Sequence, residues 1–441
     1  MTQAWTRENM SPELLRVAQR AWREPTGQFH SLAHLIDEAA LSRAYGRLRK
    51  GAAAGVDGAT KVSYGEDLAE NLKDLHTRMK QGRYRHQPIR RVNIPKGDGK
   101  TRPIGISTVE DKVVQGALRE VLETVYEQDF MDCSYGFRPG RSAHDAIRRV
   151  NRSVREKRGG WILEADIKSF FDSIDRKKLQ EMIQDRVPDG SIRRLVGKCL
   201  NVGVLDGEVC TKPEEGTAQG SGLSPLLGNI YLHYVLDRWF EDEVVKRLRG
   251  KASLIRYADD FIIVFERQDD AERVMEVLGR RMLRYGLELH PDKTRLISFG
   301  WPPRWQDKGK GPGTFDFLGF TVFWTRSRRG KWRVGIKTRR ASLRKAIRAN
   351  ADWCRRHRHE SVRDQHAMLC KKIRGHFNYF AINGNCESLQ SLIYQVGRRW
   401  FKWLQRRSQR KHHSWDWFNE VILGNYPLPS PRVCVQIWGR V

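Results

Sequence analysis

The sequence Leu254–Glu266, LIRYADDFIIVFE, places two adjacent carboxylates between short apolar runs. The runs Leu254–Ile255 and Phe261–Phe265 are rich in β-branched and aromatic residues, a composition typical of strands. We therefore expect a hairpin at the edge of a sheet, with Asp259 and Asp260 at its turn. Two like charges side by side cost free energy unless a cation offsets them, and carboxylates are ligands that Mg²⁺ prefers. The same pattern also fits an ordinary turn with both side chains solvated.

The composition indicates a polyanionic partner. The chain has 441 residues, a formal net charge of +29 and a pI near 10.1. Such a positive excess favours nucleic acid, with an anionic membrane surface as the alternative. No apolar run reaches the roughly 18 residues of a spanning helix, and the N-terminus has no apolar core of a signal peptide. The 7 cysteines form no CxxC pair, which argues against a disulfide framework or a structural zinc site. We expect a cytoplasmic protein without a membrane partner.

A further carboxylate follows an apolar run upstream. The segment Trp161–Asp175, WILEADIKSFFDSID, begins as a buried strand and continues as a turn and the start of a helix. Asp166 therefore stands at a strand end and is another candidate metal ligand. Asp172 and Asp175 fit better as helix caps or solvated residues.

A basic hairpin is expected upstream of both carboxylate sites. Residues 89–106, IRRVNIPKGDGKTRPIGI, form two strand-like runs around a Gly-rich tip. The GKT sequence at 99–101 is not a phosphate-binding P-loop, because Ile94 stands where that motif needs a glycine. Lys96 and Arg102 can still reach triphosphate oxygens, although the pattern also fits a solvated, charged hairpin.

A glycine-rich segment lies between the two carboxylate sites. Residues 216–240, GTAQGSGLSPLLGNIYLHYVLDRWF, run from a Gly-rich loop into an apolar helix. Ser224 is expected as the N-cap of that helix and Pro225 at its first position. Glycines let a backbone approach a ligand closely, and a purely structural loop is the alternative.

The composition changes at about residue 326. Between positions 326 and 411 there are 25 Lys or Arg residues against 4 Asp or Glu residues, with aromatic residues interleaved at helical spacing. This pattern predicts a separate basic helical domain, in which cations neutralise phosphates and rings can stack on bases. We expect roughly half of the rings to belong to the domain core instead.

Together these features are the parts of a nucleotidyl transferase. Two-metal phosphoryl transfer needs carboxylates that hold two cations a few ångströms apart. It also needs positive side chains on a triphosphate. Asp166, Asp259 and Asp260 meet the first requirement, and the basic hairpin meets the second.

Seven sequence blocks occur in the order found in reverse transcriptases. On these blocks the chain resembles the reverse transcriptase/maturase proteins encoded by bacterial group II introns, and the resemblance covers nearly the whole chain. The blocks are IPKGDGKTRPIGI (94–106), SYGFRPGRSAHDAI (134–147), ADIKSFFD (165–172), GTAQGSGLSPLLGNIYL (216–232), YADD (257–260), LHPDKT (289–294) and FLGF (317–320).

The resemblance implies an α+β, right-hand polymerase: fingers, a palm with an antiparallel sheet, and an α-helical C-terminal thumb or maturase domain. It implies a helical N-terminal extension at 1–60, fingers at 61–160, a palm with interleaved fingers segments at 161–325, and a thumb at 326–441. The implied activity is RNA-directed DNA synthesis, with binding of intron RNA that assists splicing and retrohoming. The implied partners are an RNA template, group II intron RNA, a DNA primer or target, and dNTPs. The implied cofactor is a pair of Mg²⁺ ions, with Mn²⁺ as a substitute.

The resemblance also implies roles for single residues. Asp166, Asp259 and Asp260 are the implied catalytic carboxylates and metal ligands, and the backbone carbonyl of Ile167 adds a further ligand oxygen. Phe171 is expected to exclude a ribose 2′-OH. The other residues expected to bind the nucleotide are Lys96, Arg102, Gln219, Gly220 and Lys293.

Two departures and two alternatives accompany this hypothesis. Gly222 replaces a bulkier residue that is commoner in the family, so we expect a more pliant loop there. No His/Asn-rich nuclease segment with paired cysteines follows the thumb, which implies priming from other DNA ends or nicks. The alternatives are a non-polymerising RNA-binding maturase and a host-recruited reverse transcriptase in repair, phage defence or CRISPR spacer acquisition. The intact carboxylate trio favours an active polymerase.

Overall fold

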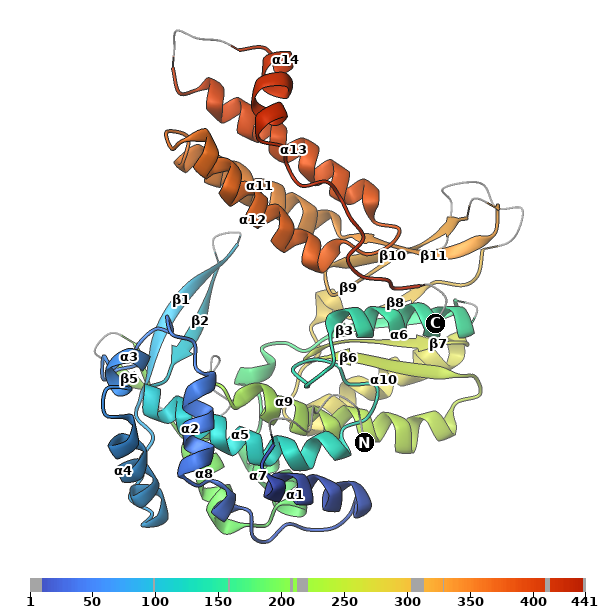
Figure 1. Cartoon of the computed structure of the whole chain (residues 1–441). Helices are drawn as coiled ribbons and strands as arrows, with labels where there is room; N and C mark the ends of the chain where they lie inside the picture. The colour runs from blue at the N-terminus through green and yellow to red at the C-terminus, as the bar shows by residue number, and fades with distance from the viewer. Residues whose placement is uncertain are drawn as a thin grey trace.

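The fold combines helices with mainly antiparallel sheets (Figure 1). The computed structural model describes residues 10–97, 100–157, 159–206, 209–211, 221–302, 313–327, 329–408 and 413–438. In this part of the chain the strands form sheets with the orders β2-β1-β4-β5, β6-β7-β3-β8 and β11-β10-β9. The α+β class predicted from the sequence is confirmed. Within the same ranges, no helix has the length and apolar character needed to cross a membrane.

The N-terminal helices pack around one long, buried helix. Helix α5 (Val109–Asp129) is contacted by α1, α2, α8 and α9, which bury most of its side chains. The neighbouring helices in this region are α1 (Pro12–Arg23), α2 (Glu38–Arg47), α3 (Lys61–Tyr64) and α4 (Leu68–Lys80).

The basic hairpin is present as strands β1 (Ile89–Gly97) and β2 (Lys100–Ile106), which pair in antiparallel register. Strands β4 (Val204–Asp206) and β5 (Val209–Thr211) extend this sheet, with β4 parallel to β1. A segment that follows β3 in sequence therefore returns to the sheet of the hairpin.

The carboxylate-bearing strands share one antiparallel sheet. Along β3, successive side chains enter two different cores: Ile162 packs with α6 (Ala143–Glu156), and Leu163 packs with α10 (Gln268–Arg284). This alternation places one helix on each face of the sheet. In spatial order the strands are β6 (Ala252–Tyr257), β7 (Asp260–Phe265), β3 (Trp161–Asp166) and β8 (Arg295–Ser298).

The apolar helix α9 begins one residue earlier than expected. Ser224 is its first residue rather than its N-cap, and Leu223 takes the N-cap position without a side-chain hydrogen bond. Leu223 is fully buried, so an apolar contact rather than a polar cap fixes the entry of the chain. The helices of this region are α7 (Arg176–Arg186), α8 (Gly190–Leu200) and α9 (Ser224–Leu232), which continues into π-helical turns at His233–Asp237 and Phe240–Val244. Asp175 caps α7, as predicted.

The C-terminal segment is not helical from its start. Strand β11 (Trp332–Thr338) pairs with β10 (Phe320–Arg326), which pairs with β9 (Phe315–Phe317). The expectation of helices from residue 326 is wrong for this strand, because its alternate side chains are buried against the palm. Figure 1 shows the helices that follow rising above this sheet, opposite the β1–β2 hairpin. They are α11 (Arg340–Arg356), α12 (Val362–Phe380), α13 (Cys386–Gln405) and the short α14 (Trp415–Trp417).

The aromatic residues of these helices divide between core and surface, as expected. Trp353 and Trp400 are buried, whereas Tyr394 has 56% of its surface exposed. The chain then returns towards the palm, where the Arg148 side chain of α6 donates a hydrogen bond to the Gln436 carbonyl at 2.9 Å.

Candidate active site

Asp259 and Asp260 lie at a tight hairpin turn, as predicted. Tyr257 ends β6 and pairs with Asp260 at the start of β7, so only Ala258 and Asp259 connect the two strands. Ala258 has a φ of 58°, a left-handed conformation that costs an L-residue about 1–2 kcal/mol. Backbone strain is thus concentrated beside a candidate metal ligand.

Asp166 lies across the sheet from Asp260. The two residues are direct partners in the antiparallel pairing of β3 with β7. Opposed side chains in such a pair share one face, with Cβ atoms about 4.5–5.5 Å apart. The structure therefore brings together two strand ends that lie far apart in sequence.

The electrostatics of the site reflect its crowded carboxylates. Burial raises the pKa of the Asp260 carboxyl to about 7, and the negative charges of Asp166 and Asp259 act in the same direction. The Lys293 ammonium forms an ion pair with the Asp166 carboxylate, although 57% of the Lys293 side chain is exposed. Because most of the Lys293 side chain is exposed, its ammonium can move away from Asp166 without disturbing the core.

A cavity of about 450 Å³ opens at Asp166 and Asp260; Asp259 is not part of its lining. Its far wall is the turn at Leu318 and Gly319, both with positive φ. The Tyr379 hydroxyl of α12 donates a hydrogen bond to the Leu318 carbonyl at 2.9 Å, so a C-terminal helix fixes this wall. Asp166, Asp260 and Lys293 line the near side of the cavity.

Phe171 sits on the short turn that follows Asp166 and is held by an aromatic contact and a glycine. Its ring centroid lies 5.1 Å from that of Phe170. A Cβ at Gly228 of α9 would lie 3.2 Å from the Phe171 ring and 2.9 Å from the Phe170 ring. Glycine at position 228 therefore lets α9 approach both rings. This role of Gly228 was not predicted, although the glycine interrupts an apolar helix.

Comparison with known proteins identifies the family. The profile of the family described as "Reverse transcriptase (RNA-dependent DNA polymerase)" matches residues 94–322, which include every carboxylate discussed above. The chain belongs to the reverse transcriptase family. The fold, the recognised sequence blocks and the enzyme class, an RNA-directed DNA polymerase, agree with this match. Members of this family generally use divalent metal ions and act on nucleic acids.

The relatives of this reverse transcriptase include proteins with intron-related names. It is 34% identical over 310 residues to Protein YkfC of Escherichia coli strain K12, covering 64% of this chain and 78% of that protein. It is 43% identical over 165 residues to the Group II intron-encoded protein LtrA of Lactococcus lactis subsp. cremoris, covering 37% of this chain and 27% of that protein. It is 30% identical over 128 residues to Nuclear intron maturase 4, mitochondrial, of Arabidopsis thaliana, covering 29% of this chain and 16% of that protein.

The carboxylate cluster of the reverse transcriptase suits a divalent cation without being a closed metal cage. Within the described ranges, no three His, Cys, Asp or Glu side chains stand close enough to hold a metal by themselves. Asp260 nevertheless experiences two neighbouring negative charges in a half-buried position, a repulsion that a cation would remove. Ile167 and Leu289 face each other in an isolated β-bridge. The two hydrogen bonds of this bridge are made by the Lys168 amide and the Asp166 carbonyl, and the Ile167 carbonyl takes no part in them. These oxygens fit the open, water-completed coordination that Mg²⁺ favours.

Four of the predicted nucleotide-binding residues are not placed by the structure. Gln219 and Gly220 lie outside the described residues, as do the side chains of Lys96 and Arg102 on the hairpin. The glycine-rich loop is described again from Ser221, and the Gly222 amide donates a hydrogen bond to the Gln115 side-chain oxygen of α5 at 3.0 Å. The end of this loop is thus attached to the buried helix α5.

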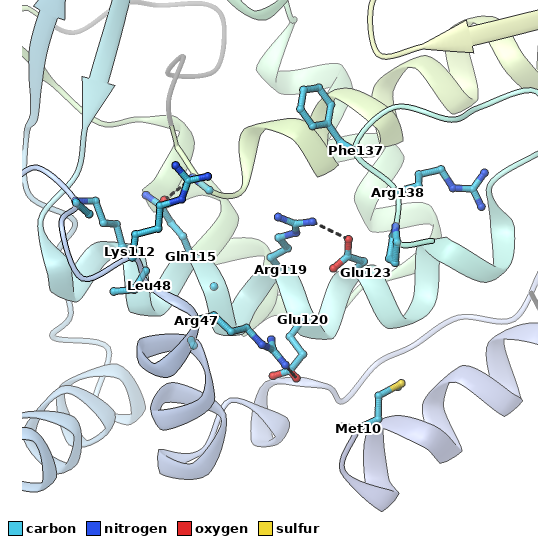
Figure 2. Close-up of a pocket in the computed structure, with 16 residues that line it drawn as sticks. Met10, Arg47, Leu48, Lys112, Gln115, Arg119, Glu120, Glu123, Phe137 and Arg138 are labelled. Carbon is cyan, nitrogen blue, oxygen red and sulfur yellow. Dashed lines mark hydrogen bonds and ion pairs between the residues drawn. The ribbon is translucent and has the colours of Figure 1, made fainter. Parts of the chain in front are cut away.

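A second cavity, of about 960 Å³, lies between α2, α5 and the loop that carries Phe137 (Figure 2). Phe137 has 50% of its surface exposed and a φ of 57°. Figure 2 shows it above Arg119, whose guanidinium contacts the Glu123 carboxylate of the same helix at 3.0 Å. The lining also includes the basic residues Arg47, Arg49 and Lys112. Sequence reasoning missed this cavity, because its walls come from segments far apart in the chain.

Neutralising Asp260 should stabilise the metal-free protein at high pH. The fold binds the Asp260 proton more tightly than the unfolded chain does, so the carboxylate costs stability as the pH rises from about 4 towards 7. Asp260→Asn should therefore raise the unfolding midpoint in EDTA by a few degrees at pH 8 and give no such gain at pH 4. Calorimetry at both pH values measures this, with the surface variant Asp269→Asn as control. An equal gain at both pH values would contradict the repulsion.

Truncating Phe171 should relax the choice of sugar. If the ring excludes a 2′-OH, Phe171→Ala should raise the efficiency of rNTP incorporation about 10²-fold or more relative to dNTP incorporation, because the clash is removed. Single-nucleotide incorporation with matched dNTP and rNTP measures the ratio. Phe170→Leu is the control, since it alters the adjoining buried ring. Unchanged discrimination by Phe171→Ala would remove Phe171 from the nucleotide site.

Proposed function

We propose that this reverse transcriptase copies RNA into DNA by two-metal nucleotidyl transfer and also binds group II intron RNA to assist splicing and retrohoming. The observation that carries the polymerase part is the convergence of Asp166 and Asp260 across the palm sheet, with Asp259 at the adjoining turn. The names of its relatives and its basic C-terminal helices support the intron part.

In this proposal the carboxylates of Asp166 and Asp259 hold two Mg²⁺ ions, with Asp260 and the Ile167 carbonyl beside them. Mn²⁺ can substitute, because the ligands are all oxygens. When bound, the ions activate the primer hydroxyl and stabilise charge on the leaving pyrophosphate. The chain itself fixes the geometry: β3 and β7 set the spacing of Asp166 and Asp260, and the turn at Ala258 orients Asp259.

The incoming dNTP is proposed to lie between the hairpin and the palm. Lys96 and Arg102 would contact its phosphates, and Gln219 and Gly220 would lie under the nascent base pair. Lys293, already paired with Asp166, would move to the leaving pyrophosphate. A flexible ammonium suits this task, because it can follow the negative charge as the charge develops.

The template and primer are proposed to run between the fingers and the thumb. The cavity shown in Figure 2 combines an exposed aromatic ring with basic side chains, a pairing that suits unpaired RNA ahead of the site. On the other side, the turn at Leu318 would contact the primer end. The proposed boundaries are 1–60 for the N-terminal extension, 61–160 for fingers, 161–325 for palm and 326–441 for thumb, with β4 and β5 as fingers segments within the palm range.

A splicing assay tests the intron part of the proposal. Asp259→Ala removes a metal ligand and leaves the basic helices intact, so it should still accelerate splicing of the cognate group II intron while failing to extend a primer. The opposite result is expected when three exposed basic residues of α11 are neutralised together, in the variant Arg344→Gln, Lys345→Gln and Arg348→Gln. This triple variant should bind RNA more weakly and lose the acceleration of splicing, while it still extends a primer. If the wild type extends primers but binds intron RNA no better than unrelated RNA, the host-recruited alternative replaces the maturase role.

A further inference from the structure

Arg256 is a buried cation within the palm sheet. Its side chain has no exposed surface, and neither has that of its partner Asp237. The guanidinium donates two hydrogen bonds to the Asp237 carboxylate, at 2.8 and 2.5 Å. Removing two charges from water is costly, so a buried pair of this kind persists only with good geometry and further hydrogen bonds.

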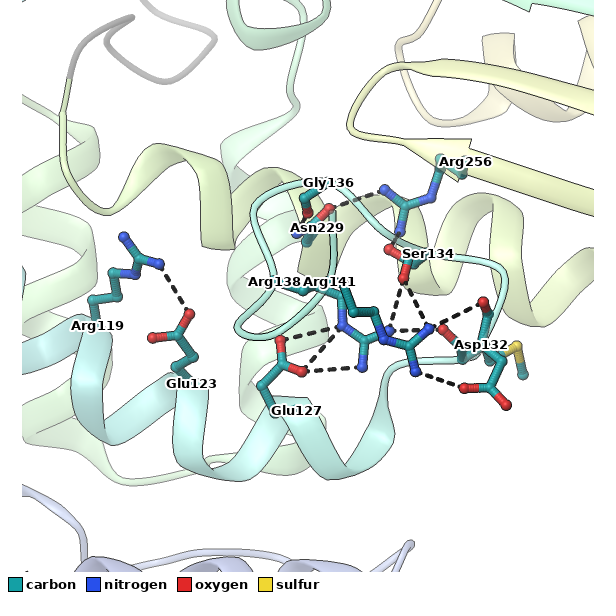
Figure 3. Close-up of polar contacts among 11 residues, drawn as sticks. Arg119, Glu123, Glu127, Asp132, Ser134, Gly136, Arg138, Arg141, Asn229 and Arg256 are labelled. Atoms are coloured by element: carbon teal, nitrogen blue, oxygen red, sulfur yellow. Dashed lines mark hydrogen bonds and ion pairs between the residues drawn. The ribbon is translucent and has the colours of Figure 1, made fainter. Parts of the chain in front are cut away.

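Those further hydrogen bonds lead away from the ion pair in three directions, and Figure 3 shows the first two. The Arg256 guanidinium donates to the Ser134 hydroxyl at 2.7 Å and to the Asn229 side-chain oxygen at 3.0 Å. The Asn229 amide in turn donates to the Gly136 carbonyl at 2.8 Å. Ser134 and Gly136 belong to the SYGF segment, which Figure 3 shows looping past the end of the hairpin.

The third direction is the catalytic turn itself. The Arg256 guanidinium donates to the Ala258 carbonyl at 3.1 Å, inside the two-residue connection that carries Asp259. Gly136 presses on the same residue: a Cβ at position 136 would lie 2.4 Å from the Ala258 nitrogen. Ala258 is the strained residue of the turn, and such strain persists only where the surroundings hold it in place.

The supports of this network are themselves fixed. Asp237 ends a π-helical turn, His233–Asp237, a helix form that is often found at functional sites. On the other side, the buried Arg138 donates to the Ser134 carbonyl at 3.0 Å and forms an ion pair with Glu127 of α5 at 3.0 Å. Asp237 and Arg138 thus connect the turn to the π-helical segment His233–Asp237 and to helix α5.

We propose that Arg256 is a positioning residue for the metal site: by binding Asp237, Ser134, Asn229 and the Ala258 carbonyl, it holds the strained turn in the conformation that presents Asp259 to the cation. This inference rests on the proposed role of Asp259 as a metal ligand. Arg256 does not touch the substrate or the metal. Its effect is on the affinity of the carboxylates for the divalent ion, and through that affinity on the rate.

The test compares two buried arginines that differ in position. Arg256→Lys keeps the charge but loses the planar fork that reaches several partners at once. Arg186→Lys is the matched control, because Arg186 is also buried, with 4% of its side chain exposed, and forms two hydrogen bonds of 2.8 Å with Asp129, against the N-terminal helix α1. Mn²⁺ binding by electron paramagnetic resonance is measured on both variants, on the wild type and on Asp259→Ala, together with thermal unfolding.

We expect Arg256→Lys to weaken Mn²⁺ binding about tenfold or more and Arg186→Lys to leave it unchanged, while both lower the unfolding midpoint. In primer extension, the deficit of Arg256→Lys should shrink as the metal concentration rises, with the KM for dNTP little changed at saturating metal. Mn²⁺ binding by Arg256→Lys equal to the wild type, or an equal loss in Arg186→Lys, would overturn the proposal.

Ser134→Ala provides the test if Arg256→Lys does not fold, because it removes one hydrogen bond and leaves the ion pair in place. It should weaken Mn²⁺ binding by roughly two- to tenfold, the usual range for one such bond. No change would overturn the proposal. The metal titration also separates this inference from the polymerase proposal: selective loss of Mn²⁺ binding in a protein that extends no primer would support the positioning role and refute only the activity.

Discussion

Replacing Asp259 by alanine should abolish primer extension, with kcat reduced about 10³-fold or more at saturating dNTP and Mg²⁺. A bound metal contributes several kcal/mol to the stabilisation of transition-state charge, and each 1.36 kcal/mol is about a factor of ten in rate. Asp259 lies in the two-residue turn beside Asp260. The turn is strained at Ala258, so a replacement carboxylate could take the place of Asp259 only if the hairpin moved. Quench-flow measurement of single-nucleotide incorporation gives the rate.

Two controls separate loss of the metal site from loss of the fold. Asp269→Ala removes a surface carboxylate that pairs with Arg267 at the start of α10, beyond the end of β7 opposite to Asp260, and should keep the wild-type rate within about twofold. Affinity of Asp259→Ala for a primer–template duplex should also remain close to that of the wild type, because the basic helices are untouched. A variant that retains a tenth of the wild-type rate would contradict the assignment of Asp259 as a metal ligand.

RNA binding should weaken by about 10³-fold or more between 50 and 200 mM salt. That loss corresponds to six to ten phosphate contacts, each of which releases a counterion when a Lys or Arg side chain neutralises it. The chain carries a net charge of +29, and its C-terminal helices expose long basic rows such as Arg344, Lys345 and Arg348 on α11. Fluorescence anisotropy with a labelled RNA across this salt range measures the slope.

Single substitutions of the three α11 residues test whether each of them contacts a phosphate. Each of Arg344→Gln, Lys345→Gln and Arg348→Gln should reduce the slope of log affinity against log salt by about one if the residue contacts a phosphate. Tyr394→Phe, at an exposed aromatic residue of α13, should leave the slope unchanged. An affinity for RNA that barely changes with salt would contradict the account of the basic helical domain.

The carboxylates of the proposed metal site stand out in the sequence because their signal is local. Adjacent aspartates between strand-like runs mark Asp259 and Asp260 in a single window, and an apolar run ending in a carboxylate marks Asp166. Their convergence was also within reach, because antiparallel strands of one sheet place such ends together. The pairing of Asp166 with Lys293 was not predicted, since it depends on the register of β8 and the turn before it.

The supports of the site could not be predicted in the same way. Arg256 stands in a run of apolar residues, where an arginine is usually read as pointing to solvent, and its partner Asp237 looks like an ordinary helix carboxylate. Only the fold shows that both are buried and that they meet. The same is true of Gly136, whose importance lies in the close approach of Ala258 from a distant strand.

The strand β11 was missed because charge hid its periodicity. Arg333 and Lys337 made the segment read as the start of a basic helical domain, yet they alternate with Val334 and Ile336, which are buried. Alternation with period two is the signal of a half-buried strand. In a chain with this excess of Lys and Arg, the positions of the apolar residues are the more reliable guide to secondary structure.

The most direct test of the central claim is DNA synthesis on an RNA template by the wild-type protein, with a DNA primer, dNTPs and Mg²⁺. The arrangement of Asp166, Asp259 and Asp260 predicts extension to the end of the template, no extension when EDTA replaces Mg²⁺, and restored extension with Mn²⁺. Tight binding of the RNA duplex without any product, under conditions in which the protein is folded, would contradict the claim and leave an RNA-binding protein whose carboxylates need another explanation.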